Sequence, residues 1–326
     1  MLTKLRKTPV VIAAAAALAL TACGGDAAPA EGETTQLTIG LIPIVDVAPV
    51  YLGIQEGYFE EEGIELEPVL AAGGAAIVPA VTSNSYQIGF SNNVSLIIGV
   101  SKGLPLQMVA PGVGISPDNR SSNPDAGYCS VITSADSPIQ STADLSGRTI
   151  AVNTLNNIGD VTIKAALESE GIDPSTVNFT ELPFPDMPAA VEQNRIDAAW
   201  ACEPFVTRLM DNGGRVILDN YAKTDPNLSV ASYFAADQWA QQNPEVLAAF
   251  KRAMDKSMKY AAENPDAVRG VLTDYTSIDA DAANRIGLPA FPDDFNEASL
   301  EKLIQYSEEQ GLLGEPVTVQ QLIADQ

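Results

Sequence analysis

The sequence predicts an α/β protein with two lobes, each built on a mostly parallel β-sheet flanked by helices. Short apolar segments alternate with segments of helix length from residue 37 to about residue 205. Strands that are separated by helices form parallel, doubly wound sheets. The alternation restarts near residue 148. The fragments Glu62-Gly-Ile-Glu and Glu170-Gly-Ile-Asp occupy equivalent places in the two series, so two similar lobes are expected.

The N-terminus has the features of a secretion signal. A basic start at residues 4–7 precedes an apolar run at residues 10–20, which is too short to span a bilayer as a helix. The next residues, Leu-Thr-Ala-Cys23, resemble the bacterial lipobox, in which the cysteine receives a diacylglycerol and the chain is cut before it. We therefore expect residues 1–22 to be a lipoprotein signal peptide and Cys23 to carry the lipid. An ordinary signal peptide with an incidental cysteine is the alternative.

The first lobe is expected to follow a flexible tether. Residues 23–36 are rich in Gly, Ala, Glu and Pro and contain no large apolar residue, so they cannot form a core. The elements predicted next are a strand at 37–42, a helix at 49–58 ended by Gly57 and Gly63, a strand at 65–69, a helix after Gly73-Gly74 and a strand at 87–90.

The second series predicts the other lobe. Its elements are a strand at 148–152, a loop at 153–157, a helix at 159–170 with Asn157 as N-cap and Asp160 completing a capping box, a helix from 186 to 194 and a strand at 196–201. After about residue 228 the pattern is mostly helical, and one helix starting near Asn243 carries an apolar stripe. We expect lobe 1 to comprise residues 37–127 and 228–326, and lobe 2 residues 128–227.

The net charge of the chain limits the classes of partner that it can bind. The formal net charge is −24, and about −27 without the three basic residues of the signal. This acidity excludes nucleic acid, because phosphate contacts need Lys and Arg. It also excludes adhesion to anionic lipid through surface charge, so the Cys23 lipid is the only membrane attachment expected.

Two cysteines remain in the mature chain. Cys129 and Cys202 are 73 residues apart, and outside the cytoplasm a disulfide is permitted. The sequence leaves open whether they form a disulfide or are two buried free thiols.

Several catalytic motifs are absent from the sequence. The chain has no histidine, which excludes Ser-His-Asp and Cys-His catalysis and HExxH zinc sites. It has no Gly-Lys pair and therefore no P-loop. Gly112-Val-Gly114 lacks a third glycine and is interpreted as a loop. The acidic runs at residues 60–62 and 293–294 are interpreted as solvated surface, because consecutive side chains point in different directions. No catalytic residue, metal or cofactor is predicted.

Five segments together resemble the nitrate, sulfonate, taurine and thiamine-pyrimidine group of solute-binding proteins. They are residues 49–66 (PVYLGIQEGYFEEEGIEL), 143–152 (ADLSGRTIAV), 185–190 (PDMPAA), 197–200 (DAAW) and 203–205 (EPF). The resemblance implies a type II periplasmic-binding-protein-like fold with two crossover strands, which captures a small solute and delivers it to an ABC permease with its ATPase subunits. A monomer is expected. A solute-sensing lipoprotein and, less favoured, a pyrimidine-forming enzyme of the same fold are the alternatives.

The strand ends identify a candidate ligand site. In open parallel sheets, ligands bind beyond the carboxyl ends of the strands. That rule selects four polar loops without Lys or Arg, at residues 44–46, 91–93, 153–157 and 203–204. The candidate ligand-binding residues are Asp46, Ser91, Asn92, Asn93, Asn153, Asn156, Asn157, Glu203 and Tyr233. Alternatively, Asp46 is a turn residue, Ser91, Asn93 and Asn157 only cap helices, and Tyr233 belongs to the core.

The same loops limit the kind of solute. Asparagine side chains offer both a donor and an acceptor, and Glu203 can accept hydrogen bonds from an amine or a ring N–H. The stretch at residues 43–49 looks more like nitrate-binding than pyrimidine-binding relatives. We expect a small polar or planar nitrogen-containing solute, held mainly by hydrogen bonds. A sulfonate held by backbone amides remains the alternative.

Overall fold

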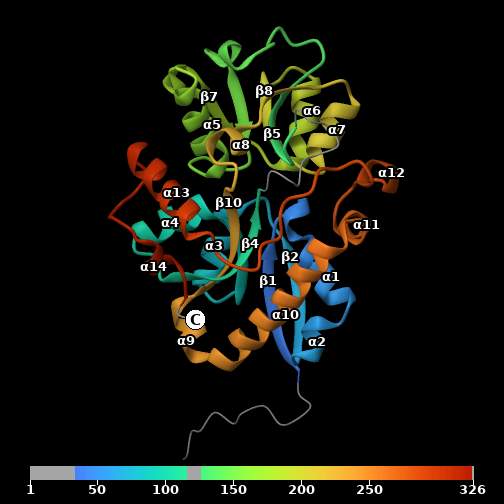
Figure 1. The fold of residues 1–326 in the computed structure, drawn as a ribbon, viewed down its shortest axis with the longest axis vertical. Coiled ribbons are helices and arrows are strands. Elements are labelled where there is room, and N and C mark those ends of the chain that lie inside the picture. The colour runs from blue at the N-terminus through green and yellow to red at the C-terminus, as the bar shows by residue number, and fades with distance from the viewer. Residues whose placement is uncertain (1–33, 116–125, 325–326) are drawn as a thin grey trace, which may run out of the picture. The chain divides into compact units, whose positions relative to one another are not determined.

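The structure is a computed structural model that describes residues 34–115 and 126–324. The predicted signal peptide, the lipidation site at Cys23 and most of the predicted tether lie outside the described residues. From Thr34 onward the chain forms a single unit. Within it are two five-stranded sheets, each with helices packed on it (Figure 1).

The first sheet has the strand order β2-β1-β3-β10-β4. Its strands are β1 (Thr35–Leu41), β2 (Ile64–Leu70), β3 (Ile88–Asn92), β4 (Leu106–Gly114) and β10 (Ser229–Ala236). β1 pairs in parallel with β2 and β3, and β10 is antiparallel to both of its neighbours.

The second sheet repeats this order as β7-β6-β8-β5-β9. Its strands are β5 (Cys129–Thr133), β6 (Thr149–Val152), β7 (Asn178–Glu181), β8 (Ala198–Cys202) and β9 (Arg215–Leu218). β6 pairs in parallel with β7 and β8, and β5 is antiparallel to β8 and β9. Each sheet is therefore parallel except for one strand at the same position, as expected for two copies of one topology.

Helices fall into three groups along the chain. The first group alternates with strands β1 to β4 along the chain. It consists of the 3₁₀ turn η1 (Val45–Val47), α1 (Ala48–Gln55), α2 (Tyr58–Glu61), α3 (Gly74–Thr82) and α4 (Asn93–Ser101). The second sheet carries α5 (Ile158–Ser169), α6 (Met187–Glu192), α7 (Phe205–Asp211) and α8 (Asn220–Thr224), with 3₁₀ turns η2 (Thr142–Leu145), η3 (Pro174–Thr176) and η4 (Phe184–Asp186).

The C-terminal segment supplies the third group. It contains α9 (Asp237–Gln242), α10 (Pro244–Glu263), α11 (Pro265–Tyr275), α12 (Ala280–Ala283), α13 (Glu297–Glu309) and α14 (Val319–Leu322). α10 packs against α1 and α2, and α13 packs against α4 and α5. The C-terminal segment therefore packs on helices of the first sheet, and α13 also contacts α5, a helix of the second sheet.

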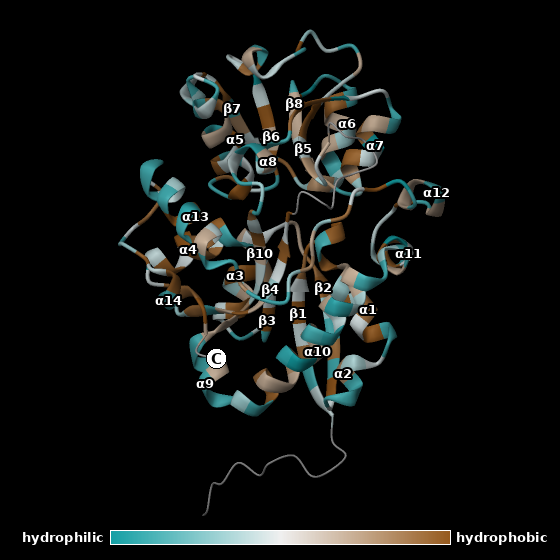
Figure 2. Cartoon of the chain, viewed as in Figure 1, coloured by the Kyte–Doolittle hydropathy of each residue, from teal (hydrophilic) through white to brown (hydrophobic). Residues whose placement is uncertain are grey.

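The core is continuous and apolar. Brown, hydrophobic stretches lie in strands of both sheets in Figure 2, whereas much of α10 and α13 is teal, the colour of hydrophilic residues. The predicted stripe of α10 is buried at Phe250, Met254, Met258 and Ala261, and Leu247 is half-buried. In the two described ranges, no helix is both long and apolar enough to cross a membrane.

Four local predictions are corrected by the structure. The first strand begins at Thr35, two residues before the predicted start of the lobe. The helix predicted over residues 49–58 is broken at Gly57, whose φ of 77° is accessible to glycine without strain. The interpretation of residues 112–114 as a loop is wrong, because they complete β4. The segment after residue 228, expected to be mostly helical, begins with β10, a strand buried along its whole length.

Candidate functional site

A cavity of about 20 Å³ lies where strand ends of both sheets meet. Its lining comes from residues at or just after the ends of β1, β3, β6 and β8, from helix starts and from β10. These residues are Ile42, Ile44, Asp46, Phe90, Asn92, Asn153, Ile158, Phe184, Trp200, Cys202, Tyr221, Val230 and Ala231. A volume of this size holds about one water molecule. A solute of several non-hydrogen atoms therefore requires the two walls to move apart.

Asp46 places a carboxylate in this lining. It lies in η1 directly after β1 and is 2 % exposed. Its Oδ1 atom has no hydrogen-bond partner in the part of the chain that the structure describes. The loop is held from both sides, because the Val45 N–H donates to the Glu203 carbonyl (3.0 Å) and the Tyr275 hydroxyl donates to the Ile44 carbonyl (3.0 Å). Asp46 is therefore a fixed, buried acceptor that faces a cavity.

Burial dominates the electrostatics of Asp46. Burial raises the pKa of Asp46 to about 7, opposed by a hydrogen bond from its own backbone N–H. The charge of Asp46 contributes to raising the pKa of four tyrosines, Tyr128, Tyr221, Tyr233 and Tyr275. Burial raises the pKa of every one of these phenols above its usual value, and the charge of Asp46 is the next cause for Tyr128, Tyr221 and Tyr233. For Tyr275 the effect of Tyr51 comes before that of Asp46. Among the described residues, no Lys or Arg contributes to the shift in the pKa of Asp46.

Asn92 connects the start of α4 with the start of α5. Its Oδ1 atom accepts from the Ser95 N–H (2.9 Å) and caps α4, and it also accepts from the Ile158 N–H (3.2 Å). Its Nδ2 atom donates to the Ser95 hydroxyl (3.0 Å). Because Ile158 is the first residue of α5, one oxygen satisfies backbone donors of two helices that belong to different sheets. This contact joins the two walls of the cavity.

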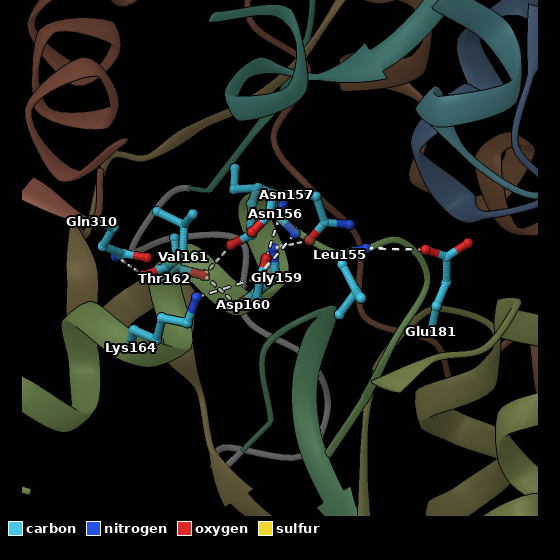
Figure 3. Close-up of polar contacts among 11 residues, drawn as sticks. Leu155, Asn156, Asn157, Gly159, Asp160, Val161, Thr162, Lys164, Glu181 and Gln310 are labelled. Atoms are coloured by element: carbon cyan, nitrogen blue, oxygen red, sulfur yellow. Dashed lines mark hydrogen bonds and ion pairs between the residues drawn. The ribbon is translucent and has the colours of Figure 1, made fainter. Parts of the chain in front are cut away.

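Asn153 lines the cavity and belongs to a loop that Asn157 organises. Figure 3 shows Asn157 beside Gly159 and Asp160 at the start of α5. Asn157 is the N-cap of α5: its Oδ1 accepts from the Gly159 N–H (2.7 Å), and its own N–H donates to Asp160 (2.7 Å). Its Nδ2 donates to Asn153 Oδ1 (2.7 Å) and to the Thr154 hydroxyl (2.8 Å). Asn157 therefore shapes the loop and has no described contact with the cavity, whereas Asn153 lines it.

The structure places four other predicted site residues outside the lining. Asn93 is fully buried, donates to Ser229 and accepts from the Ser232 hydroxyl (2.7 Å), so it fastens α4 to β10. Asn156 is exposed. Ser91 and Tyr233 are buried, and their hydroxyls have no partner among the described residues. Tyr233 packs against Phe90, which does line the cavity.

Glu203 holds neighbouring segments together through its carboxyl group. It is 1 % exposed, and its Oε2 atom accepts from the Thr207 N–H (2.9 Å). Its Oε1 atom accepts from the Thr207 hydroxyl (2.8 Å) and from the Gly287 N–H (3.1 Å). Burial raises the pKa of Glu203 to about 7 in spite of these three donors. The carboxyl group caps α7 and ties it to the C-terminal segment, and it is absent from the lining.

The aromatic part of the lining was missed in the sequence. Phe184 and Trp200 pack at 5.5 Å between ring centroids, and Trp200 meets Tyr221 edge-on at 6.0 Å. The indole Nε1 of Trp200 has no hydrogen-bond partner among the described residues. No local pattern separates an aromatic residue of a cavity wall from one of the core, so these three carried no usable signal.

The two cysteines are joined. Cys129 of β5 stands opposite Cys202 of β8 in the antiparallel register, and the structure links their sulfurs. Of the two alternatives that the sequence left open, the structure has the disulfide. It lies at the end of β8, where Cys202 also lines the cavity.

A larger depression of about 290 Å³ lies elsewhere, between α7 and the segment before α12. Its lining includes Arg208, Asp211 and Asp279. Asp211 also pairs with Arg285 at 2.5 Å, and both side chains are about half exposed. Among the described residues, no buried polar atom without a partner belongs to the lining of this depression, so we take the small cavity as the candidate site.

Similarity to known proteins agrees with this architecture. The chain is 25 % identical over 245 residues to the formylaminopyrimidine-binding protein of Halalkalibacterium halodurans, covering 74 % of this chain and 70 % of that protein. It is 30 % identical over 199 residues to the taurine-binding periplasmic protein of Escherichia coli, covering 59 % of this chain and 56 % of that protein.

Solved structures share the fold. The alkanesulfonate-binding protein SsuA of Xanthomonas axonopodis superposes with a TM-score of 0.73 at 16 % identity, over 90 % of this chain and 99 % of that chain. A desulfurization enzyme, DSZB, superposes with a TM-score of 0.62 at 17 % identity, over 89 % of this chain and 96 % of that chain. At these identities the likeness shows the fold alone, and it confirms the predicted periplasmic-binding-protein-like α/β architecture.

A family model covers the site itself. The model described as "NMT1/THI5 like" matches residues 44–268, a span that holds Asp46, Asn92, Asn153 and Trp200. That span is more than half of the chain and includes strands of both sheets. The chain therefore belongs to the NMT1/THI5-like family.

Proposed function

We propose that this chain is the lipid-anchored, extracytoplasmic solute-binding component of an ABC importer. It captures a small polar or planar solute that contains nitrogen or sulfur between its two lobes, at residues 37–127 with 228–326 and at residues 128–227. It then delivers the solute to a permease served by an ATPase, and it acts as a monomer. The relatives named for formylaminopyrimidine and taurine binding support a solute of this size.

One observation carries the proposal. Strand ends from both sheets line one cavity, and two of the lining residues have a buried polar atom without a described partner, Asp46 Oδ1 and Trp200 Nε1. A buried polar group without a partner costs free energy. A solute that supplies a donor to Asp46 and an acceptor to Trp200 removes both costs at once.

The contacts across the cavity support capture by closure. The Asn92–Ile158 hydrogen bond spans the two walls, and a volume of about 20 Å³ is too small for the solute classes named above. The walls must therefore separate for entry. A solute that binds the closed arrangement more tightly than the open one shifts the population toward closure, which is the signal that a permease can read.

Solute capture is tested by thermal unfolding of the chain from Gly24 onward, which keeps every described residue. The panel contains nitrate, taurine, alkanesulfonates, aminopyrimidines and riboflavin. A solute at 100 times its Kd should add about 2.7 kcal/mol to the free energy of unfolding. Ala231→Leu fills the cavity and should abolish the shift, whereas Ala248→Leu on the exposed face of α10 should retain it. If no panel member shifts the unfolding temperature, the proposal of solute capture is wrong.

Anchoring is tested separately. Cys23→Ala in the full chain should move the protein from the membrane fraction to the soluble fraction and stop incorporation of labelled palmitate. A variant that still fractionates with the membrane would contradict lipid anchoring without affecting solute capture.

A sensor and an enzyme are the competing functions. A sensory lipoprotein would bind solute in the same way, and neighbouring genes for a permease and an ATPase would favour transport over signalling. The desulfurization enzyme of the same fold is the observation that favours an enzyme. The pyrimidine-forming enzymes of this fold group are thought to consume their own histidine, and this chain contains none. We therefore propose a binding protein without catalytic activity.

A further inference from the structure

The lining of the cavity has an unusual charge. Among the described residues that line it, Asp46 alone has an acidic or basic side chain. The side chain is buried, and no Lys or Arg lies in the lining to neutralise it. An anionic solute would therefore have to lie near a carboxylate in a partly desolvated site, without a counter-charge from the walls.

The other polar side chains of the lining already use part of their hydrogen-bonding capacity within the chain. Asn92 Oδ1 already accepts two hydrogen bonds, and its Nδ2 donates to Ser95. Asn153 Oδ1 accepts from Asn157. The Ile158 N–H, the backbone donor at the start of α5 that could hold an oxyanion, is already bound to Asn92. Trp200 Nε1 is a buried side-chain donor of the lining that lacks a described partner.

The walls around Asp46 suit a flat ring. Phe90, Phe184, Trp200 and Tyr221 all contribute aromatic surface to the lining. Aromatic faces hold planar ligands by stacking and also attract positive charge. The cavity thus combines flat apolar walls with one carboxylate acceptor and neutral donors.

We propose that Asp46 is the residue that determines solute specificity: its carboxylate pairs with an N–H donor or a positively charged nitrogen on a planar solute, and it excludes nitrate and alkanesulfonates. The inference rests on the proposed function and selects among the solute classes named there. Unit charges of like sign about 4 Å apart in a partly screened interior weaken binding by roughly three orders of magnitude. A charge-assisted hydrogen bond, by contrast, is roughly twice as strong as a neutral one.

The experiment uses calorimetric titration of the chain from Gly24 onward at pH 8, where Asp46 is mostly ionised. The probes are 4-amino-2-methylpyrimidine, a planar ring with N–H donors, and ethanesulfonate and nitrate as anions. Asp46→Asn keeps the shape of the side chain and removes its charge, and Asp46→Ala also removes the acceptor. Asp136→Asn, on an exposed aspartate away from the cavity, is the matched control. Thermal unfolding without probe verifies that each variant is folded.

The wild type and Asp136→Asn should bind the aminopyrimidine alike and show no heat with either anion. Asp46→Asn should raise the Kd for the aminopyrimidine roughly 10- to 100-fold, and Asp46→Ala should raise it further. An unchanged Kd in folded Asp46 variants would overturn the inference and leave the proposed function intact. Binding of ethanesulfonate or nitrate by the wild type would do the same. No binding of any probe would also overturn it, and the broader thermal panel then decides whether solute capture itself fails.

Discussion

Replacing Glu203 by Gln tests whether this buried carboxyl group holds the structure together, as its contacts indicate, or contacts solute. The carboxylate accepts from the Thr207 N–H and hydroxyl on α7 and from the Gly287 N–H. A glutamine amide has one oxygen and one NH₂ group. In either orientation, one of the two backbone N–H groups faces the NH₂ group and loses its acceptor. An unpaired buried N–H costs about 1–3 kcal/mol.

The pKa of Glu203 makes the size of this effect depend on pH. Burial raises that pKa from 4.5 to about 7, so the folded chain holds a proton that the unfolded chain has released between these pH values. The stability due to this group is therefore fully present below pH 4.5 and is lost as the pH rises through 7. A shift of this size corresponds to about 3 kcal/mol. Glutamine carries no such penalty, since it does not titrate.

We therefore expect Glu203→Gln to be less stable than the wild type by about 2 kcal/mol near pH 4.5, and of equal or higher stability at pH 8. Below pH 5 the protonated carboxyl group can still serve all three partners, because its hydroxyl can donate to the Thr207 hydroxyl. The measurement is urea unfolding followed by circular dichroism at both pH values. Subtracting the wild-type curve cancels the titration of Asp46, which is present in both proteins.

Glu192→Gln is the control for this experiment. Its carboxylate accepts from Asn212 in an exposed hydrogen bond, so the change should stay within about 0.5 kcal/mol at both pH values. An equal loss of stability at pH 4.5 and pH 8 for Glu203→Gln would refute the assigned titration. Unaltered stability combined with lost solute binding would return Glu203 to the ligand site that the sequence predicted.

Three further substitutions test the parts that shape the site. The disulfide closes a separation of 73 residues, so Cys129→Ala with Cys202→Ala should cost roughly 4 kcal/mol in urea unfolding, and dithiothreitol should destabilise the wild type but not this double variant. Asn157→Ala should lower the free energy of unfolding by about 2–3 kcal/mol, because it removes the N-cap of α5 and two buried hydrogen bonds that the side chain donates. Asn157→Ser should recover part of this loss, because serine also caps helices, and equal losses in the two variants would argue against the cap. A Cβ atom at position 159 would lie 2.5 Å from the Trp200 ring, so Gly159→Ala should shift the indole fluorescence and weaken solute binding, and an unchanged spectrum would contradict this close packing.

The sequence by itself determined the alternation of strands and helices and the edge of the sheets at which the polar loops lie. Both depend on short-range chemistry. The apolar runs at residues 37–42 and 148–152 form strands in either lobe, and the Asn157–Asp160 capping box sets the start of α5 within four residues of chain. Because all parallel strands present their carboxyl ends at one edge, Asp46, Asn92 and Asn153 could be placed at the cavity from the order of elements alone.

Only the tertiary structure decided which of these polar groups are already bound and which face the cavity without a partner. Glu203 and Asp46 look alike in sequence, since each follows a strand. Glu203 is saturated by Gly287, 84 residues further on, and the Asp46 loop is held by Tyr275, 231 residues from Ile44. β10 was missed for a related reason: it is buried on both faces and lacks the alternation that marks a half-exposed strand. Long-range packing sets these partners, and no local pattern carries that information.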